Sequence, residues 1–119
     1  MSNKDHSGIA AGRRTSARVF AALGGEPRLL LVAKLCTGEP QSISQLTKGS
    51  RLTRQAITKH LRVLENAGIV HSVHEGRESL FKFDPAPIEG AKKYLDLVSE
   101  QWDQTLLRLK AFVEGEGTQ

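Results

Sequence analysis

The stretch that decides the fold runs from Thr53 to Val70 and reads TRQAITKHLRVLENAGIV. The hydroxyl of Thr53 can cap a helix N-terminus, and Gly68 can end the helix because glycine adopts the left-handed conformation at low cost. Between them, Ile57, Leu61 and Leu64 form one apolar stripe at helical spacing. The stretch therefore predicts an amphipathic helix with marked ends.

The opposite face of this helix is cationic and carries no acidic residue. It consists of short and long hydrogen-bonding side chains, namely Arg54, Gln55, Thr58, Lys59 and Arg62. Arginine and glutamine can read base edges in the major groove, whereas threonine and lysine can hold phosphates. The pattern predicts a recognition helix for double-stranded DNA.

This stretch resembles the recognition helix of the ArsR/SmtB family of winged-helix repressors. The matching residues are Thr53, Ile57, Thr58, Lys59, His60, Leu61, Leu64, Ala67, Gly68, Ile69 and Val70. The resemblance extends over roughly residues 16–114. It implies a mainly α fold with a small β-hairpin, a winged helix-turn-helix of order α-α-α-α-β-β-α. It also implies a homodimer whose terminal helices form the interface.

The charge distribution agrees with a DNA-binding surface near this helix. The 119 residues suit one domain and carry a net charge of +4. Five basic residues and no acidic residue lie between Gln41 and Arg62, whereas seven acids and four bases lie between Asp84 and Gln119. The basic charge is therefore concentrated where the recognition helix is predicted.

The N-terminal part predicts a tail and two helices. Residues 1–12 are polar and glycine-rich, so we expect a disordered tail, with the domain at residues 13–114 and a loose tail at residues 115–119. A first helix should end near Leu23 and bury Ala17, Phe20 and Leu23. A second helix should begin around Pro27. Its stretch from Leu29 to Cys36 is apolar on nearly every side, which predicts a helix buried in the core.

The residues around the recognition helix complete the motif. Ser42 can cap a short helix from Ile43 to about Lys48, and residues 49–52 then turn into the recognition helix. After Gly68 the pattern becomes β-type, with strands expected at residues 69–74 and 79–83. The turn between them contains Gly76 and Arg77, and we expect Arg77 at the tip of this wing to contact DNA.

The longest helix is predicted from Ile88 to about Glu114. Apolar residues recur every seven positions, which is the pattern of a coiled-coil seam. A small domain has little core to cover so long a face, so a second protomer is expected there. The predicted dimer contacts are Phe20, Ile88, Leu95, Val98, Trp102, Leu109 and Phe112.

Neither metal site of the family is matched. One family site needs a Cys-x-Cys pair where this chain has Ser42 and Ser44, and serine is a poor ligand for soft metals. The other uses Asp, His and Glu on the last helix, which contains no histidine here. His71 and His74 lie three apart in a strand and so point to opposite faces. We therefore expect no metal and no cofactor.

Cys36 is the only cysteine, so no intramolecular disulfide can form, and we expect a buried structural thiol rather than a redox switch. His60 should be a packed, hydrogen-bonded histidine. The sequence shows no targeting segment, no membrane span and no catalytic constellation. A cytoplasmic protein that is not an enzyme is the simplest interpretation.

The sequence thus predicts a DNA-binding regulator, most simply a homodimeric repressor of an imperfect palindromic operator. Its predicted DNA contacts are Arg51, Thr53, Arg54, Gln55, Thr58, Lys59, Arg62 and Arg77. One alternative is the same protein acting as a sensor of a metal, an oxidant at Cys36 or an organic ligand. Another is a winged helix that binds only proteins, which would not need a basic recognition face.

Overall fold

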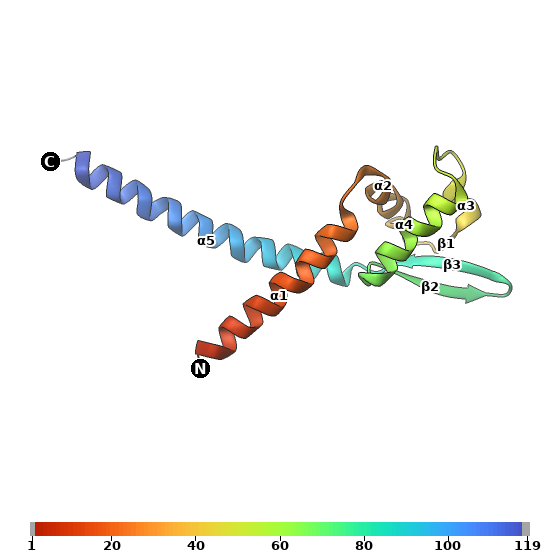
Figure 1. Ribbon diagram of the computed structural model, residues 1–119, viewed down its shortest axis with the longest axis horizontal. Coiled ribbons are helices and arrows are strands. Elements are labelled where there is room, and N and C mark those ends of the chain that lie inside the picture. Colours follow the sequence, from red (N-terminus) through yellow and green to blue (C-terminus); the bar gives the residue numbers. More distant parts are fainter. Residues whose placement is uncertain (1, 118–119) are drawn as a thin grey trace.

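The computed structural model describes the backbone of residues 2–117 and the side chains of residues 11–115. These residues form five helices and three strands along the chain (Figure 1). Their order is α1 (Ser2–Leu23), α2 (Glu26–Leu35), β1 (Gln41–Ser42), α3 (Ile43–Thr47), α4 (Arg54–Asn66), β2 (Val70–Glu75), β3 (Glu78–Phe83) and α5 (Ala86–Gly117). The predicted winged helix-turn-helix is confirmed, with α4 as the recognition helix.

The wing is an antiparallel sheet of strand order β1-β3-β2. In its hairpin Val70 pairs with Phe83 and Glu75 with Glu78, so a two-residue turn joins the strands. Gly76 opens this turn with a φ of 65°, and positive φ at the first central residue is what a tight hairpin turn requires. The hairpin predicted from the glycine and the β-type pattern is therefore confirmed.

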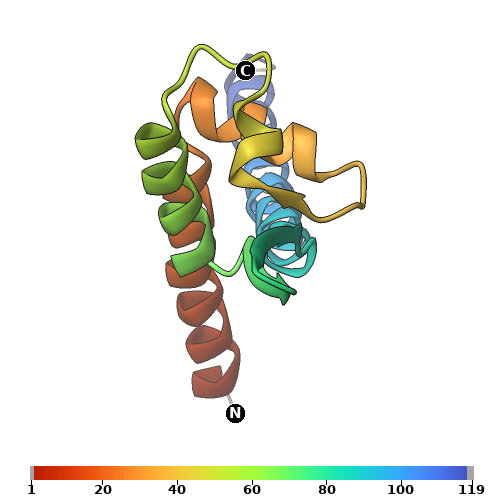
Figure 2. The same ribbon diagram turned by 90° about the vertical axis from the view of Figure 1, so that its right-hand side faces the viewer.

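The core lies where α1, α2, α3 and α4 meet the base of the sheet. Its largest fully buried side chains are Val19, Leu35, Leu46, Ile57, Leu61, Leu64, Ile69 and Val70. The stripe predicted on α4 supplies three of them. Because that stripe faces inward, α4 lies along one edge of the molecule with its other face open (Figure 2).

The molecule is elongated because α5 extends far beyond this core. Its principal extents are 74 × 36 × 21 Å and its radius of gyration is 20.2 Å, whereas a compact domain of this length has about 13.5 Å. The 32 residues of α5 span about 48 Å at the usual helical rise. α1 crosses the first part of α5, and the distal part projects alone (Figure 1).

The two ends differ from the predicted tails. Helix α1 begins at Ser2 and α5 continues to Gly117, in stretches expected to be disordered or loose. No proline interrupts either stretch, so each helix can continue past the residues that pack on the core. Met1 and residues 118–119 lie outside the described residues, and the exact limits of the domain stay a prediction.

The buried face of α1 was predicted one residue out of phase. Ser16, Val19 and Ala22 are buried, Leu23 is partly buried, and Ala17 and Phe20 are exposed. The helix turns Ser16 toward the core. Because serine is polar, its presence in the sequence does not indicate a core position. Hydrophobic spacing alone therefore gave the wrong phase.

Helix α2 is buried on one side only, which corrects a second prediction. Leu31, Val32 and Leu35 are buried, whereas Leu29 and Leu30 are about half exposed. Cys36 is also exposed, so the buried structural thiol predicted there is wrong. It caps the C-terminus of α2, where the chain turns outward toward Gly38.

The short strand β1 was not predicted. Gln41 pairs with Phe81 and Ser42 with Leu80, which makes β3 the central strand. Two residues are too few to produce an alternating pattern in the sequence. Among the described helices, none combines the length and the apolar content needed to cross a bilayer.

Candidate nucleic-acid interface

Side-chain caps fix the geometry of the helix-turn-helix. Ser42 Oγ accepts the backbone N–H of Gln45 at 3.2 Å, and the Gln45 side chain accepts the backbone N–H of Ser42 at 2.8 Å. This reciprocal capping box begins α3. Thr53 Oγ1 accepts the backbone N–H of Ala56 at 3.1 Å and begins α4. Both predicted caps are therefore confirmed.

The turn between the two helices is also held in place. Gly49 adopts a φ of 73°, and Ser50 Oγ accepts the backbone N–H of Leu52 at 3.0 Å. At the other end of α4, Gly68 has a φ of 75°, and the backbone N–H of Ile69 donates to the Leu64 carbonyl at 2.9 Å. The start and end of the recognition helix are thus both defined by the sequence.

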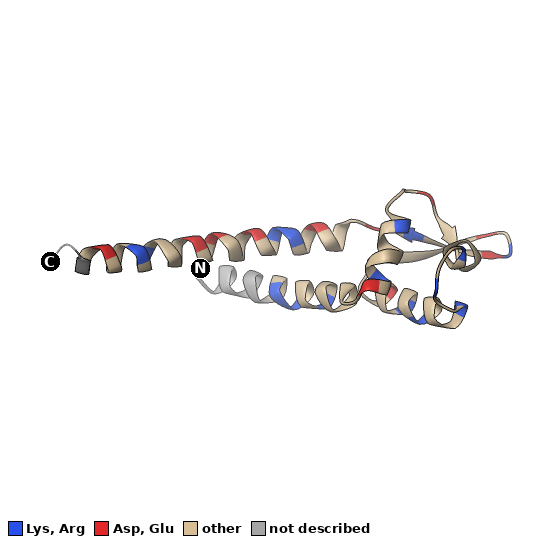
Figure 3. Cartoon of the chain, turned by 90° about the horizontal axis from the view of Figure 1, so that it is seen from above, with Lys and Arg blue, Asp and Glu red and all other residues tan. Residues whose placement is uncertain are grey.

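The outer face of α4 is exposed and cationic. Arg54, Gln55, Lys59 and Arg62 are exposed, and with the partly buried Thr58 they line one shallow hollow. The two ion pairs within the described part of the chain are His71–Asp84 and Lys110–Glu114. Neither neutralises a cation on this face, which leaves its full charge available to an anionic partner. In Figure 3 the Lys and Arg positions of α4 appear as blue bands, whereas α5 carries both red and blue bands.

The wing comes close to the start of the recognition helix. Arg54 and Arg77 line a second hollow together with Ser42, Ile43, Ser44, Glu78 and Ser79. The fold thus brings together two predicted DNA contacts that are 23 positions apart in the sequence. Glu75 and Glu78 flank the turn that holds Arg77, so the wing tip is less positive than the α4 face.

Two of the predicted contact residues use their hydroxyl groups in hydrogen bonds with the backbone of α4. Thr58 Oγ1 donates to the Arg54 carbonyl at 2.8 Å, so its proton is already engaged. Thr53 Oγ1 acts as an acceptor in its cap, so its own proton is free to reach a phosphate. Arg51 lies apart from the α4 face, on the turn that faces α2.

Arg28 is a positioning residue that sequence analysis missed. Its guanidinium donates to the Ala22 carbonyl at 2.6 Å and to the Gly24 carbonyl at 2.7 Å, and it also lies 3.3 Å from His60 Nδ1. With Nδ1 as the acceptor, the His60 proton sits on Nε2. Arg28 thereby ties the turn between α1 and α2 to the recognition helix, and the predicted hydrogen-bonded His60 is confirmed.

The two histidines of the wing lie within hydrogen-bonding distance of nearby side chains. His71 Nε2 lies 2.9 Å from Asp84 Oδ2, and His74 Nδ1 lies 3.4 Å from Ser79 Oγ. Among the side chains of residues 11–115, no three His, Cys, Asp or Glu gather as metal ligands would. Ser42 uses its hydroxyl for the α3 cap, so the position of the family's first thiolate has a structural role here.

Asp84 joins the wing to α5. Its Oδ1 accepts the backbone N–H of Ala86 at 3.0 Å at the start of α5, while Oδ2 faces His71. The hydrogen bond from Ala86, followed by that from His71, lowers the pKa of Asp84 below its ordinary 3.8. The carboxylate is therefore charged at neutral pH.

The predicted dimer contacts fall into two groups. Trp102, Leu109 and Phe112 are exposed by 62%, 57% and 65%, and Leu95 and Phe20 are exposed as well. Ile88 packs against the core of its own domain, and Val98 is partly buried. The apolar face without a partner in the described chain is therefore the distal part of α5, extended by Leu106 and Val113.

Comparison with known proteins gives the same fold and motif. The family model described as bacterial regulatory protein, arsR family, matches residues 26–72. A solved ArsR-like transcriptional regulator from Rhodococcus sp. RHA1 is 35% identical, with a TM-score of 0.75 over 84% of this chain and 93% of that one. The chain belongs to the ArsR family of transcriptional regulators.

Two curated relatives agree with this assignment. The uncharacterized HTH-type transcriptional regulator YuzN of Bacillus subtilis is 35% identical over 63% of this chain and 88% of its own. The HTH-type transcriptional regulator Rv2034 of Mycobacterium tuberculosis is 26% identical over 87% of this chain and 94% of its own. Like the rest of the ArsR family, the protein is a DNA-binding transcriptional regulator, and its family is one of regulators rather than enzymes.

Proposed function

We propose that the protein is a homodimeric repressor that places α4 of each protomer in the major groove of an imperfect palindromic operator. The observation that carries this proposal is the outer face of α4. The helix is held by a buried stripe on one side, and on the other it presents cations that form no ion pair with any described residue. The major groove admits such a helix. Guanine presents two hydrogen-bond acceptors there to arginine, and adenine presents one donor and one acceptor to glutamine.

Base reading is assigned to the first turn of α4. Arg54 and Gln55 follow the Thr53 cap directly, and the N-terminal residues of a recognition helix enter the groove most deeply. Arginine can pair with guanine and glutamine with adenine. Both side chains are exposed and neither forms an ion pair with a described residue, so both are free to meet base edges.

Phosphate binding is assigned to the surrounding residues. Lys59 and Arg62 lie further along the same face, Arg77 reaches out from the wing, and Arg51 precedes the helix. Thr53 can donate its free hydroxyl proton to a phosphate while still capping α4. Thr58 can do so only if its hydroxyl turns away from the Arg54 carbonyl.

Dimerisation is assigned to α5 and the adjoining part of α1. Trp102, Leu109 and Phe112 expose large apolar surfaces in one heptad pattern, and a second copy would bury them in the same way. A two-fold dimer would present two recognition helices to half-sites about 34 Å apart, one turn of DNA. A dimer bound across a promoter would exclude the polymerase, which is the simplest form of repression, and it would act in the cytoplasm with the DNA.

The competing function, a winged helix that binds only proteins, does not account for the charge on α4. Heparin retention that falls as salt rises would favour the DNA function. The direct test is binding to a duplex from the gene's own upstream region and to a scrambled duplex across a salt series. We expect the upstream duplex to bind at least about a thousandfold more tightly. Equal binding to both duplexes would remove the main support for a sequence-specific repressor.

A further inference from the structure

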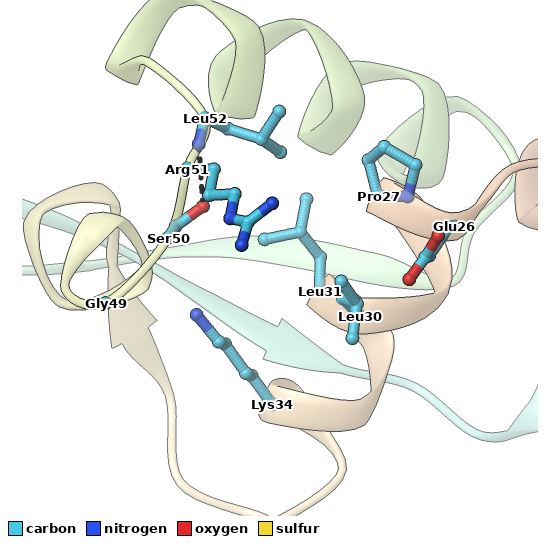
Figure 4. A pocket seen from close by; sticks show the side chains of 9 residues that line it. All are labelled: Glu26, Pro27, Leu30, Leu31, Lys34, Gly49, Ser50, Arg51 and Leu52. Atoms are coloured by element: carbon cyan, nitrogen blue, oxygen red, sulfur yellow. Dashed lines mark hydrogen bonds between the residues drawn. The ribbon is translucent and has the colours of Figure 1, made fainter.

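A cavity of about 620 Å³ lies between α2 and the turn that leads into α4 (Figure 4). Its apolar wall consists of Pro27, Leu30, Leu31 and Leu52, and its polar groups are Glu26, Lys34, Ser50 and Arg51. Pockets of this size hold small organic ligands in many proteins. None of these residues has a part in the base reading assigned to α4.

The two cations of the cavity lie at the same end. Figure 4 shows Lys34 and Arg51 on the side of the Gly49–Leu52 turn, with the Glu26 carboxylate across the leucines from them. Neither cation forms an ion pair within the described part of the chain, and the Lys34 ammonium donates to the Leu46 carbonyl at 3.3 Å. The Ser50 hydroxyl accepts from Leu52 and can still donate its proton.

From this arrangement we infer that the cavity binds a small amphipathic carboxylate. The carboxylate group would lie between Lys34 and Arg51, which can each donate charge-assisted hydrogen bonds. The apolar body would cover Leu30, which is 55% exposed, together with Pro27. Glu26 at the far end repels the anionic group and so sets the orientation of the ligand.

Binding at this cavity regulates the DNA function, an inference that rests on the proposed function. Residues Gly49–Leu52 end directly before the Thr53 cap, so a ligand held by this turn acts on the start of α4. Arg51 is also a predicted phosphate contact, and one guanidinium does not serve both partners equally well. The carboxylate and the operator therefore weaken each other's binding, as linkage between two sites requires.

The cavity is tested first without DNA. Octanoate is titrated into the 119-residue chain labelled with ¹⁵N, with octanamide as a probe that lacks the charge and inorganic phosphate as a probe that lacks the apolar body. We expect saturable shifts of the backbone amides of residues 26–34 and 49–52. Octanamide should bind at least about tenfold more weakly, since its neutral carbonyl can accept hydrogen bonds from the two cations but lacks the ionic attraction of a carboxylate. No saturation, equal binding of octanamide, or shifts confined to α5 would overturn the site.

Two matched pairs of variants locate the site. Leu30→Glu places a carboxylate in the cavity and should abolish octanoate binding, whereas Leu29→Glu makes the same change on a neighbouring exposed leucine outside the lining and should leave it unchanged. Lys34→Met should weaken binding about tenfold, and Lys48→Met, which removes a charge outside the lining, should not. Circular dichroism verifies that each variant folds, and equal effects within a pair would contradict the assignment.

Regulation is tested separately on the upstream duplex. Saturating octanoate should weaken DNA binding of the wild type at least about fivefold, the lower end of ordinary allosteric coupling. The duplex affinity of the Leu30→Glu variant, whatever its value without ligand, should not change when octanoate is added. If octanoate binds but the duplex affinity is unchanged, the regulatory role is wrong. If no duplex is bound specifically, the proposed repressor function is wrong. The titration without DNA still shows whether the cavity binds octanoate.

Discussion

The winged part of the chain and the distal part of α5 contain similarly periodic apolar residues but bury them differently. On α4, Ile57, Leu61 and Leu64 are at most 1% exposed, because α2, α3 and the sheet cover them. On α5, Trp102 and Phe112 are more than 60% exposed. A periodic stripe predicts that a helix has a partner surface, but it does not tell whether that surface belongs to the same chain.

The largest expected effect tests whether a second protomer covers α5. Trp102→Glu would place an uncompensated carboxylate in the proposed interface, at a cost of about 3–5 kcal/mol. Light scattering at micromolar concentration should show a dimer for the wild type and a monomer for the variant. Gln104→Glu adds the same charge two positions away, outside the seam, and should leave the dimer intact. A wild-type monomer that binds DNA tightly would contradict the proposed interface.

The next effect tests the winged part, where burial is complete without a partner. Leu61→Ala should lower the free energy of unfolding by about 2–5 kcal/mol, because it removes a side chain that is 1% exposed and leaves a cavity. Val63→Ala, on the neighbouring 38% exposed position, should cost less than about 1 kcal/mol. Urea unfolding at one fixed protein concentration measures both. Similar losses would mean that α4 packs differently from its burial pattern.

A smaller effect separates base reading from phosphate binding on α4. Arg54→Ala or Gln55→Ala should each remove about 1–3 kcal/mol of discrimination between upstream and scrambled duplexes. Lys59→Ala should instead weaken both duplexes equally and reduce the salt slope by about 0.9 for each phosphate that the lysine neutralises, counting both protomers. If the specificity ratio survives in Arg54→Ala and Gln55→Ala, base reading belongs to other residues such as Arg62 or the wing.

The elements that sequence analysis predicted well are those specified by local chemistry. The limits of α3 and α4 follow from side-chain caps and from Gly68, and the hairpin follows from Gly76. Each of these features depends on residues a few positions apart. The cationic face of α4 was predictable for the same reason, since helical spacing alone places its residues together.

The elements that it predicted poorly depend on distant neighbours. The buried phase of α1 and the exposed side of α2 are decided by which helices pack on them, and nothing in either stretch encodes that. Arg28 and His60 are 32 positions apart, so their interaction is visible only in the folded chain. The cavity at Lys34 and Arg51 is of the same kind, because α2 and the α3–α4 turn form it together.

The smallest expected effect concerns Asp84, at the junction between the winged part and α5. Its pKa is lowered by the hydrogen bonds from Ala86 and His71, so the folded state favours the charged carboxylate. A carboxyl group whose pKa is lower in the folded state than in the unfolded state stabilises the fold at any pH above the pKa of the unfolded state. This stabilisation is lost as the pH falls through the pKa of the folded state. The loss should therefore occur below pH 3.8. The effect is small because the His71 and Asp84 side chains are 56% and 36% exposed, and salt screens them.

Asp84→Asn tests whether this junction links the two parts through charge. The variant should be slightly less stable than the wild type at pH 7, and the difference should disappear in strong acid, where the wild-type carboxyl is also neutral. Asp96→Asn on α5 is the matched control, because no described residue forms a hydrogen bond or ion pair with that side chain. Urea unfolding from strong acid to neutral pH at constant ionic strength measures both variants. A difference in the free energy of unfolding that stays constant across this pH range would contradict the role of charge. Asp84 would then act as a hydrogen-bond acceptor for α5 regardless of its charge, and the cap rather than the ion pair would join the wing to α5.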